Sequence, residues 1–242
     1  MASSNPLDTH LKPLCARSVA NSFSSGTISP FLGVYAVQLG ASGSEMGWLQ
    51  SMISLSPNAL QLLWGKLSDS LGRRVPFILL GGLTTSFLWI PLMFVFSAEQ
   101  LILVTITQAI FGAMAIPTWT ALIGDLVPSS IMGKITASIN FWAPLGGLGA
   151  TLLSGYIMAV MTGTWQRIFF VPLFIALVCG TIASLVMLIV KEHPLSRKTR
   201  IGLSFRVSDT VRQITEAPLF SQYCLVSTAY VFLWRCLDRS SQ

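Results

Sequence analysis

Long apolar runs of about 20 residues, separated by short polar segments, make up most of the chain from residue 18 onward. The hydrocarbon core of a bilayer is about 30 Å thick, and a helix of about 20 apolar residues crosses it. The runs do not alternate between apolar and polar residues, so they predict helices rather than the strands of a membrane β-barrel. An all-α, polytopic membrane bundle is therefore expected, with six transmembrane spans over residues 18–39, 46–64, 76–96, 101–123, 135–160 and 168–190.

The C-terminal part of the chain departs from this regular pattern. Residues 191–217 form a long basic connection, and a seventh apolar stretch runs from Pro218 to about Leu237. The apolar pattern then ends abruptly in a polar tail, as in a truncated chain or after a shifted reading frame. We therefore expect a six-helix unit over 1–190, a basic cytoplasmic linker over 191–217, and a partial seventh helix with its tail over 218–242.

Composition and charge agree with a membrane protein and indicate its orientation. The chain is 52% hydrophobic and 10% charged, whereas a soluble domain carries about 25% charged residues. With the N-terminus inside, twelve of the fifteen Lys and Arg residues fall in inner segments, and the outer loops hold only Arg167. The positive-inside rule thus predicts a cytoplasmic N-terminus and a cytoplasmic 191–217 segment. Positive charges beside apolar spans argue for membrane orientation rather than nucleic-acid binding.

A short charged loop between the second and third spans carries the most specific pattern. Asp69 lies at the C-terminal end of the second helix, where the helix dipole disfavours an anion. It therefore needs a cationic partner, and Arg73 is a local candidate. Alternatively, the positive residues of this loop serve only to fix topology. The loop reads Gly65-Lys66-Leu67-Ser68-Asp69-Ser70-Leu71-Gly72-Arg73-Arg74.

Polar residues at membrane depth predict a water-filled cavity. The first span is rich in hydroxyl side chains, and such side chains either line a cavity or bond their own backbone within a packed interface. Polar residues on other spans favour the cavity, with two tryptophans as aromatic walls. The expected lining residues are Asn21, Ser25, Asn58, Gln108, Trp119, Asn140 and Trp142.

The chemistry that these spans lack is also informative. No Asp, Glu, Lys, Arg or His falls in the middle of the six expected spans, so a carboxylate–arginine proton switch is not expected there. A neutral or largely apolar solute is favoured, although a charged solute is also possible if a second half of the protein carries the counter-charge. The sequence has no nucleophile–base pair, phosphate loop or metal cluster, so neither an enzyme nor a bound cofactor or metal is expected.

The loop pattern G-x-L-x-D-x-x-G-R-R resembles the signature loop of the major facilitator superfamily of secondary transporters. The resemblance covers about residues 14–190, six helices of the usual twelve, and includes a second loop that begins at Gly124-Asp125. It implies that the loop residues help latch an inner gate. The gating residues so implied are Gly65, Asp69, Gly72, Arg73 and Arg74.

The resemblance also implies an architecture and a function. Gly26 and Pro30 in the first span loosely match Gly112 and Pro117 in the fourth, as in a 3+3 inverted repeat with interrupted helices around a central site. The implied function is secondary-active or facilitative transport of a small solute by alternating access, in the plasma membrane. The implied partners are the lipid bilayer and a second six-helix half. The alternative is a truncated, transport-inactive fragment, or a half-size subunit that acts by assembly with another half.

Overall fold

The computed structural model describes residues 6–190 and four isolated positions, 222, 226, 227 and 229. The chain divides into two compact units, Met1–Ile201 and Gly202–Gln242. The expected linker over 191–217 lies outside the described residues, as does the seventh helix over 218–237 apart from those four positions. The first unit is a helical bundle with no strand among its described residues, which confirms the all-α prediction.

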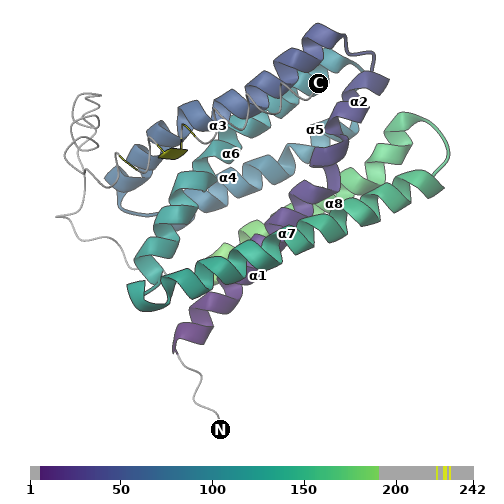
Figure 1. Cartoon of the computed structure of the whole chain (residues 1–242). Coiled ribbons are helices and arrows are strands. Elements are labelled where there is room, and N and C mark those ends of the chain that lie inside the picture. The colour runs from purple at the N-terminus through teal and green to yellow at the C-terminus, as the bar shows by residue number, and fades with distance from the viewer. Residues whose placement is uncertain (1–5, 191–221, 223–225, 228, 230–242) are drawn as a thin grey trace. The chain divides into compact units, whose positions relative to one another are not determined.

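Six helical rods make up the bundle, each either one long helix or a helix with short continuations (Figure 1). Four of the rods are long and apolar enough to cross a membrane: Val75–Met93, Ala98–Leu126, Ser129–Val160 and Trp165–Ile189. The first two rods do not meet that criterion, because their sequences contain more polar residues. In chain order the rods are α1 (Pro6–Ile28) with η1 (Ser29–Phe31) and α2 (Leu32–Gln38), α3 (Gly43–Leu71), α4 (Val75–Phe87) with α5 (Trp89–Met93), α6 (Ala98–Leu126), α7 (Ser129–Val160), and α8 (Trp165–Leu185) with η2 (Val186–Ile189).

The two helix interruptions expected at corresponding positions do not both form. The first rod changes from α1 to a 3₁₀ turn at Ser29–Phe31, with Pro30 in that turn, because proline lacks the N–H that would continue the ladder. In contrast, α6 runs without a break from Ala98 to Leu126 and contains Pro117. The expectation of an interrupted fourth helix is therefore wrong.

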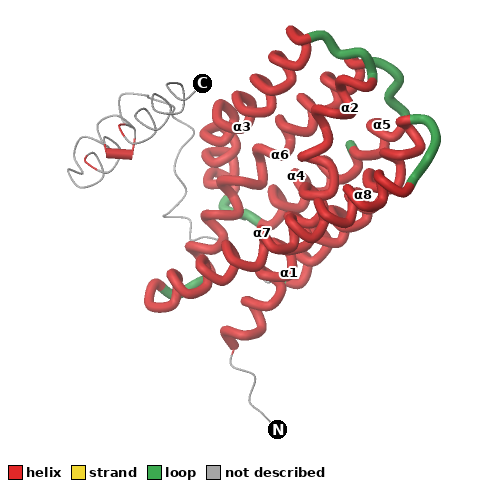
Figure 2. The backbone as a smooth tube through the Cα atoms, turned by 45° about the vertical axis from the view of Figure 1, so that its right-hand side comes forward, coloured by secondary structure: helices red, strands yellow, loops and turns green. Residues whose placement is uncertain are grey.

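Helix packing nevertheless has the symmetry of a 3+3 repeat. The first rod packs mainly through α1 against α7 and α8, the fifth and sixth rods. The fourth rod, α6, packs against α3 and α4, the second and third rods, and α4 also packs against α8. Exchanging the first three rods for the last three reproduces this set of contacts (Figure 2). Because each repeat has three rods, the second repeat starts from the opposite side of the bundle and is inverted.

Apolar clusters hold the two ends of the bundle. At one end the ring of Tyr35 stacks on that of Phe169 with 4.3 Å between centroids, and the Tyr35 hydroxyl donates to the Leu92 carbonyl. At the other end Leu14 and Leu122 belong to a second buried cluster. The serine-rich middle of α1 lies between these two clusters, and the cavities open there.

Candidate functional site: two cavities and an ion-pair cluster

Two cavities lie where α1, α4 and α6 meet. The first has a volume of about 380 Å³ and the second about 200 Å³. Asn21 and Thr85 line both cavities. Helices α1 and α6 belong to the first rods of the two repeats, so the cavities lie at the repeat interface, where transporters of inverted-repeat type bind their solutes.

Four of the seven predicted cavity residues line these spaces. Asn21 and Trp119 line the first cavity, and Asn21, Ser25 and Gln108 line the second. The Gln108 side-chain amide donates to the Thr85 carbonyl at 3.0 Å, which links α6 to α4 across the second cavity. The Ser25 hydroxyl also donates to the Asn21 carbonyl of its own helix at 3.1 Å. Ser25 therefore fits both explanations given for the hydroxyl-rich span, lining of a cavity and hydrogen bonding to the helix backbone.

The other three predicted residues line neither cavity. Asn58 is exposed on α3, where its amide donates to the Ser54 carbonyl at 2.7 Å. Asn140 is exposed on α7, and Trp142 of the same helix is 55% exposed with its ring edge-on to Phe141. Their helices are correctly predicted, but their side chains lie on open faces of this unit.

Arg17 is the cavity residue that sequence reasoning missed. It was counted among the inner topology charges because the first span was expected to begin at residue 18. However, α1 begins at Pro6, so Arg17 lies eleven residues into the helix and lines the first cavity. It is only 6% exposed, and its guanidinium carbon lies 4.2 Å from the ring centroid of Trp119. The first cavity therefore holds a fixed charge, contrary to the expectation from sequence. The serine-rich stretch that directly follows Arg17 was the signal in the sequence that the helix and its cavity begin before residue 18.

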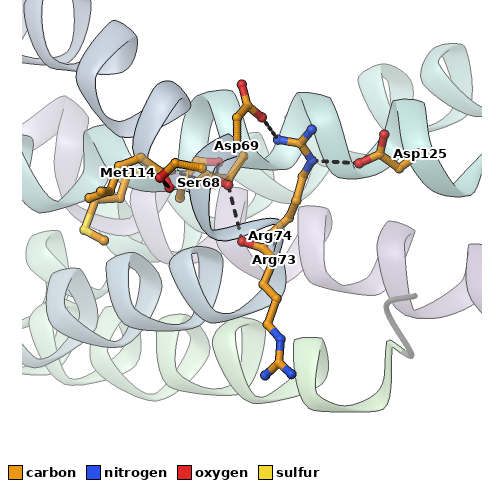
Figure 3. Close-up of polar contacts among 10 residues, drawn as sticks. Ser68, Asp69, Arg73, Arg74, Met114 and Asp125 are labelled. Carbon is orange, nitrogen blue, oxygen red and sulfur yellow. Dashed lines mark hydrogen bonds and ion pairs between the residues drawn. The ribbon is translucent and has the colours of Figure 1, made fainter. Parts of the chain in front are cut away.

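The loop between α3 and α4 holds an ion-pair cluster at the ends of three helices. One guanidinium nitrogen of Arg74, Nη1, lies 2.6 Å from Asp69 Oδ1, and its Nε lies 2.7 Å from Asp125 Oδ2 (Figure 3). Asp69 lies near the C-terminal end of α3 and Asp125 near that of α6, where helix dipoles disfavour carboxylates. Arg74 precedes α4 and compensates both charges, so it joins α3, α4 and α6 at one end of the bundle.

The sequence had suggested Arg73 as the cationic partner of Asp69, but the partner in the structure is Arg74. Helix α3 ends at Gly72, which adopts a left-handed conformation with φ of +65° that favours glycine. After this turn Arg74 is buried between the two carboxylates, whereas Arg73 is exposed and its side chain extends away from Asp69 (Figure 3). Gly65 packs on Pro117 of α6, where an added Cβ would lie at an ordinary contact distance of 3.5 Å.

The described residues offer no site for a metal ion. Within this part of the chain, no three His, Cys, Asp or Glu side chains come close enough together to ligate one. The candidate site thus consists of two polar cavities and a charge cluster.

The comparisons with known proteins agree on one family. The sequence profile described as Major Facilitator Superfamily matches residues 14–237. The chain is 33% identical over 147 residues to the bicyclomycin resistance protein homolog of Haemophilus influenzae, covering 61% of this chain and 35% of that protein. It is 28% identical over 179 residues to the quinolone resistance protein NorA of Staphylococcus aureus, covering 73% of this chain and 43% of that protein.

A solved structure and a shorter relative complete the comparison. The crystal structure of a peptide transporter, POT, has a TM-score of 0.62 at 16% identity and covers 92% of this chain and 46% of that one, which shows a shared fold. The chain thus spans less than half the length of the two resistance proteins and of the solved transporter. In contrast, 142 matched residues at 28% identity cover 58% of this chain and 85% of the uncharacterized MFS-type transporter YitZ of Bacillus subtilis.

Proposed function

Because the chain belongs to the major facilitator superfamily, we propose that it is the six-helix N-terminal half of a transporter that moves a small solute across a membrane by alternating access. The observation that carries this proposal is the pair of polar cavities between α1 and α6, the first helices of the two repeats. Such a site between repeats can be exposed to either side when one half rocks against another. Family membership identifies a transporter rather than an enzyme.

The Arg74 cluster supports a gating role at one end of the half. It fixes the ends of α3, α4 and α6 relative to one another through two charge-assisted contacts. Asp69 and Asp125 remain 33% and 39% exposed, so part of each carboxylate is free to contact a further element. We infer that the cluster belongs to an inner latch that closes against the second half of the transporter.

The relatives suggest which solutes to test first. Two of them are named for resistance to bicyclomycin and to quinolones. We propose that the transported solute is a drug-sized organic molecule. The cavity of about 380 Å³ falls within the usual range for small-molecule sites, about 300–1,000 Å³.

A second candidate is a half-size subunit that functions only after assembly with another half. The short relative YitZ, 85% of which is covered by the match, favours this possibility. The coding sequence downstream of residue 242 discriminates the two. A run of further apolar spans would indicate one long transporter, whereas a neighbouring half-size gene would indicate a two-chain assembly.

Transport itself is tested with the complete transporter, which is either the one long chain or the two-chain assembly, as the downstream coding sequence indicates. Bacteria without their own drug exporters should accumulate less of a fluorescent quinolone when they express it. Asp69→Asn should abolish most of that difference, whereas Glu99→Gln, which removes an exposed carboxylate from the first turn of α6, should not. Equal accumulation with and without the assembled protein, for quinolones and bicyclomycin alike, would contradict the proposed export of such drugs.

A further inference from the structure

The first cavity contains a buried positive charge without a compensating negative charge. Arg17 is 6% exposed, and among the described residues its guanidinium has no hydrogen bond or ion pair. No carboxylate lines either cavity, and Arg17 of the first cavity is the one charged residue among the residues that line the two. A guanidinium carries five N–H donors and is always protonated, so leaving it buried and unpaired is costly.

The contact that Arg17 does make leaves its donors available. Its guanidinium lies over the face of Trp119, 4.2 Å from the ring centroid, and such cation–π stacking uses the flat face of the group. The N–H donors point outward in the plane of the guanidinium, where a carboxylate can accept two parallel hydrogen bonds. The Nε atom is buried and has no hydrogen-bond partner among the described residues, so the charge of this group is poorly compensated within the bundle.

The remaining lining limits what this occupant can be. Ser18, Asn21 and Thr120 contribute hydroxyl and amide groups to the lining of the cavity, whereas Ile116 and Ile139 contribute apolar surface. The indole of Trp119 adds an aromatic surface next to the charge. This combination suits a small organic molecule with an apolar or aromatic body and one oxyanion group.

We propose that Arg17 and Trp119 form the binding site for the anionic group of the transported solute, a carboxylate or similar oxyanion on an apolar body. The choice of a solute as the source of the anion rests on the transport function proposed above. It replaces the expectation from sequence that a neutral solute is favoured, because that expectation depended on the absence of a charge in the cavity.

Binding of simple probes to the 242-residue chain tests the site without any transport. The chain in an uncharged detergent, free of anionic lipid, is titrated with benzoate and with benzamide, which has the same body but no charge. Equilibrium dialysis with radiolabelled probes measures both affinities. Benzoate should bind saturably and at least about tenfold more tightly than benzamide, the difference expected for charge-assisted hydrogen bonds. Equal affinities, or no saturable binding of benzoate, would overturn the proposal.

Variants locate the site and separate it from general basicity. Arg17→Gln should lower benzoate affinity at least about tenfold and leave that of benzamide unchanged, and Arg17→Lys should restore only part of it. Lys12→Gln removes an exposed positive charge from the same helix and should bind benzoate like the parent chain. Unchanged benzoate binding in Arg17→Gln would also overturn the proposal. If Arg17→Gln does not fold, the comparison of benzoate with benzamide in the parent chain still decides.

The binding test and the transport test fail separately. Benzoate binding that depends on Arg17, in a protein whose assembled form exports nothing, would keep the anion site and refute the transport proposal. Quinolone export without selective benzoate binding would keep transport and refute the anion site, leaving a carboxylate of the second half as the counter-charge of Arg17.

Discussion

Gly26 on α1 and Gly147 on α7 bring the backbones of their helices into direct contact. A Cβ atom on Gly26 would lie 2.5 Å from the carbonyl oxygen of Gly147 and 2.8 Å from its Cα. The Thr151 hydroxyl donates to the Gly26 carbonyl at 2.9 Å and strengthens the same crossing. Small residues commonly allow such close approach between membrane helices. Because α1 also lines both cavities, this crossing holds one cavity wall in place.

Gly26→Ala should therefore destabilise the bundle. The added methyl group meets backbone atoms, which cannot rotate away, so α1 and α7 must separate at a cost of about 1–3 kcal/mol. Thermal unfolding in mild detergent, followed by circular dichroism, measures the loss. Gly149→Ala is the matched control on α7, because a Cβ there meets nothing within 4 Å. It should be neutral or slightly stabilising, and equal losses in both variants would contradict the close-packing argument.

Arg74 and Arg73 are neighbours with different surroundings, and their substitutions should differ accordingly. Arg74→Gln leaves Asp69 and Asp125 without their shared partner at two helix C-termini, and we expect a loss of about 1–3 kcal/mol in stability. This range is lower than for a fully buried pair, because both carboxylates are partly exposed to solvent.

Arg73→Gln removes the same charge from an exposed side chain and should change stability by less than about 0.5 kcal/mol. Chemical unfolding of the two variants, side by side with the parent chain, measures the difference. A larger effect for Arg73 than for Arg74 would show that the cluster in Figure 3 does not form in the membrane protein.

The sequence was sufficient to predict the helices but not their rotations. Apolar runs of membrane length locate the rods, since the bilayer sets their length and their backbone bonding. Which side of a rod faces a cavity depends on packing against residues distant in sequence. Gln108 lines the second cavity and contacts α4, whereas Asn140 and Trp142 lie on exposed positions of α7.

Two errors arose from local boundaries. The first helix starts twelve residues before the apolar run that predicted it, so Arg17 was assigned to a flanking segment instead of the cavity. Apolar periodicity cannot detect a helix that continues beyond its apolar run, as α1 does through the buried Arg17. At Asp69 the sequence showed the need for a cation, but the turn at Gly72 determined which arginine supplies it. That choice depends on a left-handed backbone conformation and on Asp125, fifty-six residues further along the chain.

Orientation in the membrane remains a prediction, and single cysteines at two exposed positions test it. In a background without the native cysteines, Ser130→Cys reports on the start of α7 and Thr162→Cys on the α7–α8 loop. The charge distribution predicts a cytoplasmic position for the first and an external one for the second. A membrane-impermeant maleimide applied to intact cells should therefore label Thr162→Cys alone. Labelling of Ser130→Cys alone would reverse the orientation, and permeabilised cells provide the control for reactivity.

The last prediction concerns the 242-residue chain by itself. Asn21 and Asn140 are exposed in this unit, and each costs about 1–3 kcal/mol if it meets lipid without a hydrogen-bond partner. Helix α7 also presents exposed apolar side chains along one face, at Phe141, Leu145, Leu148 and Leu152. A second copy could cover these groups in place of a missing half, so we expect the chain to self-associate. Light scattering in mild detergent should give the mass of a dimer or larger assembly that dissociates as the ratio of detergent to protein rises. A monomer at every ratio that also catalyses saturable solute uptake in proteoliposomes would refute the half-transporter proposal, because one unit would then be sufficient.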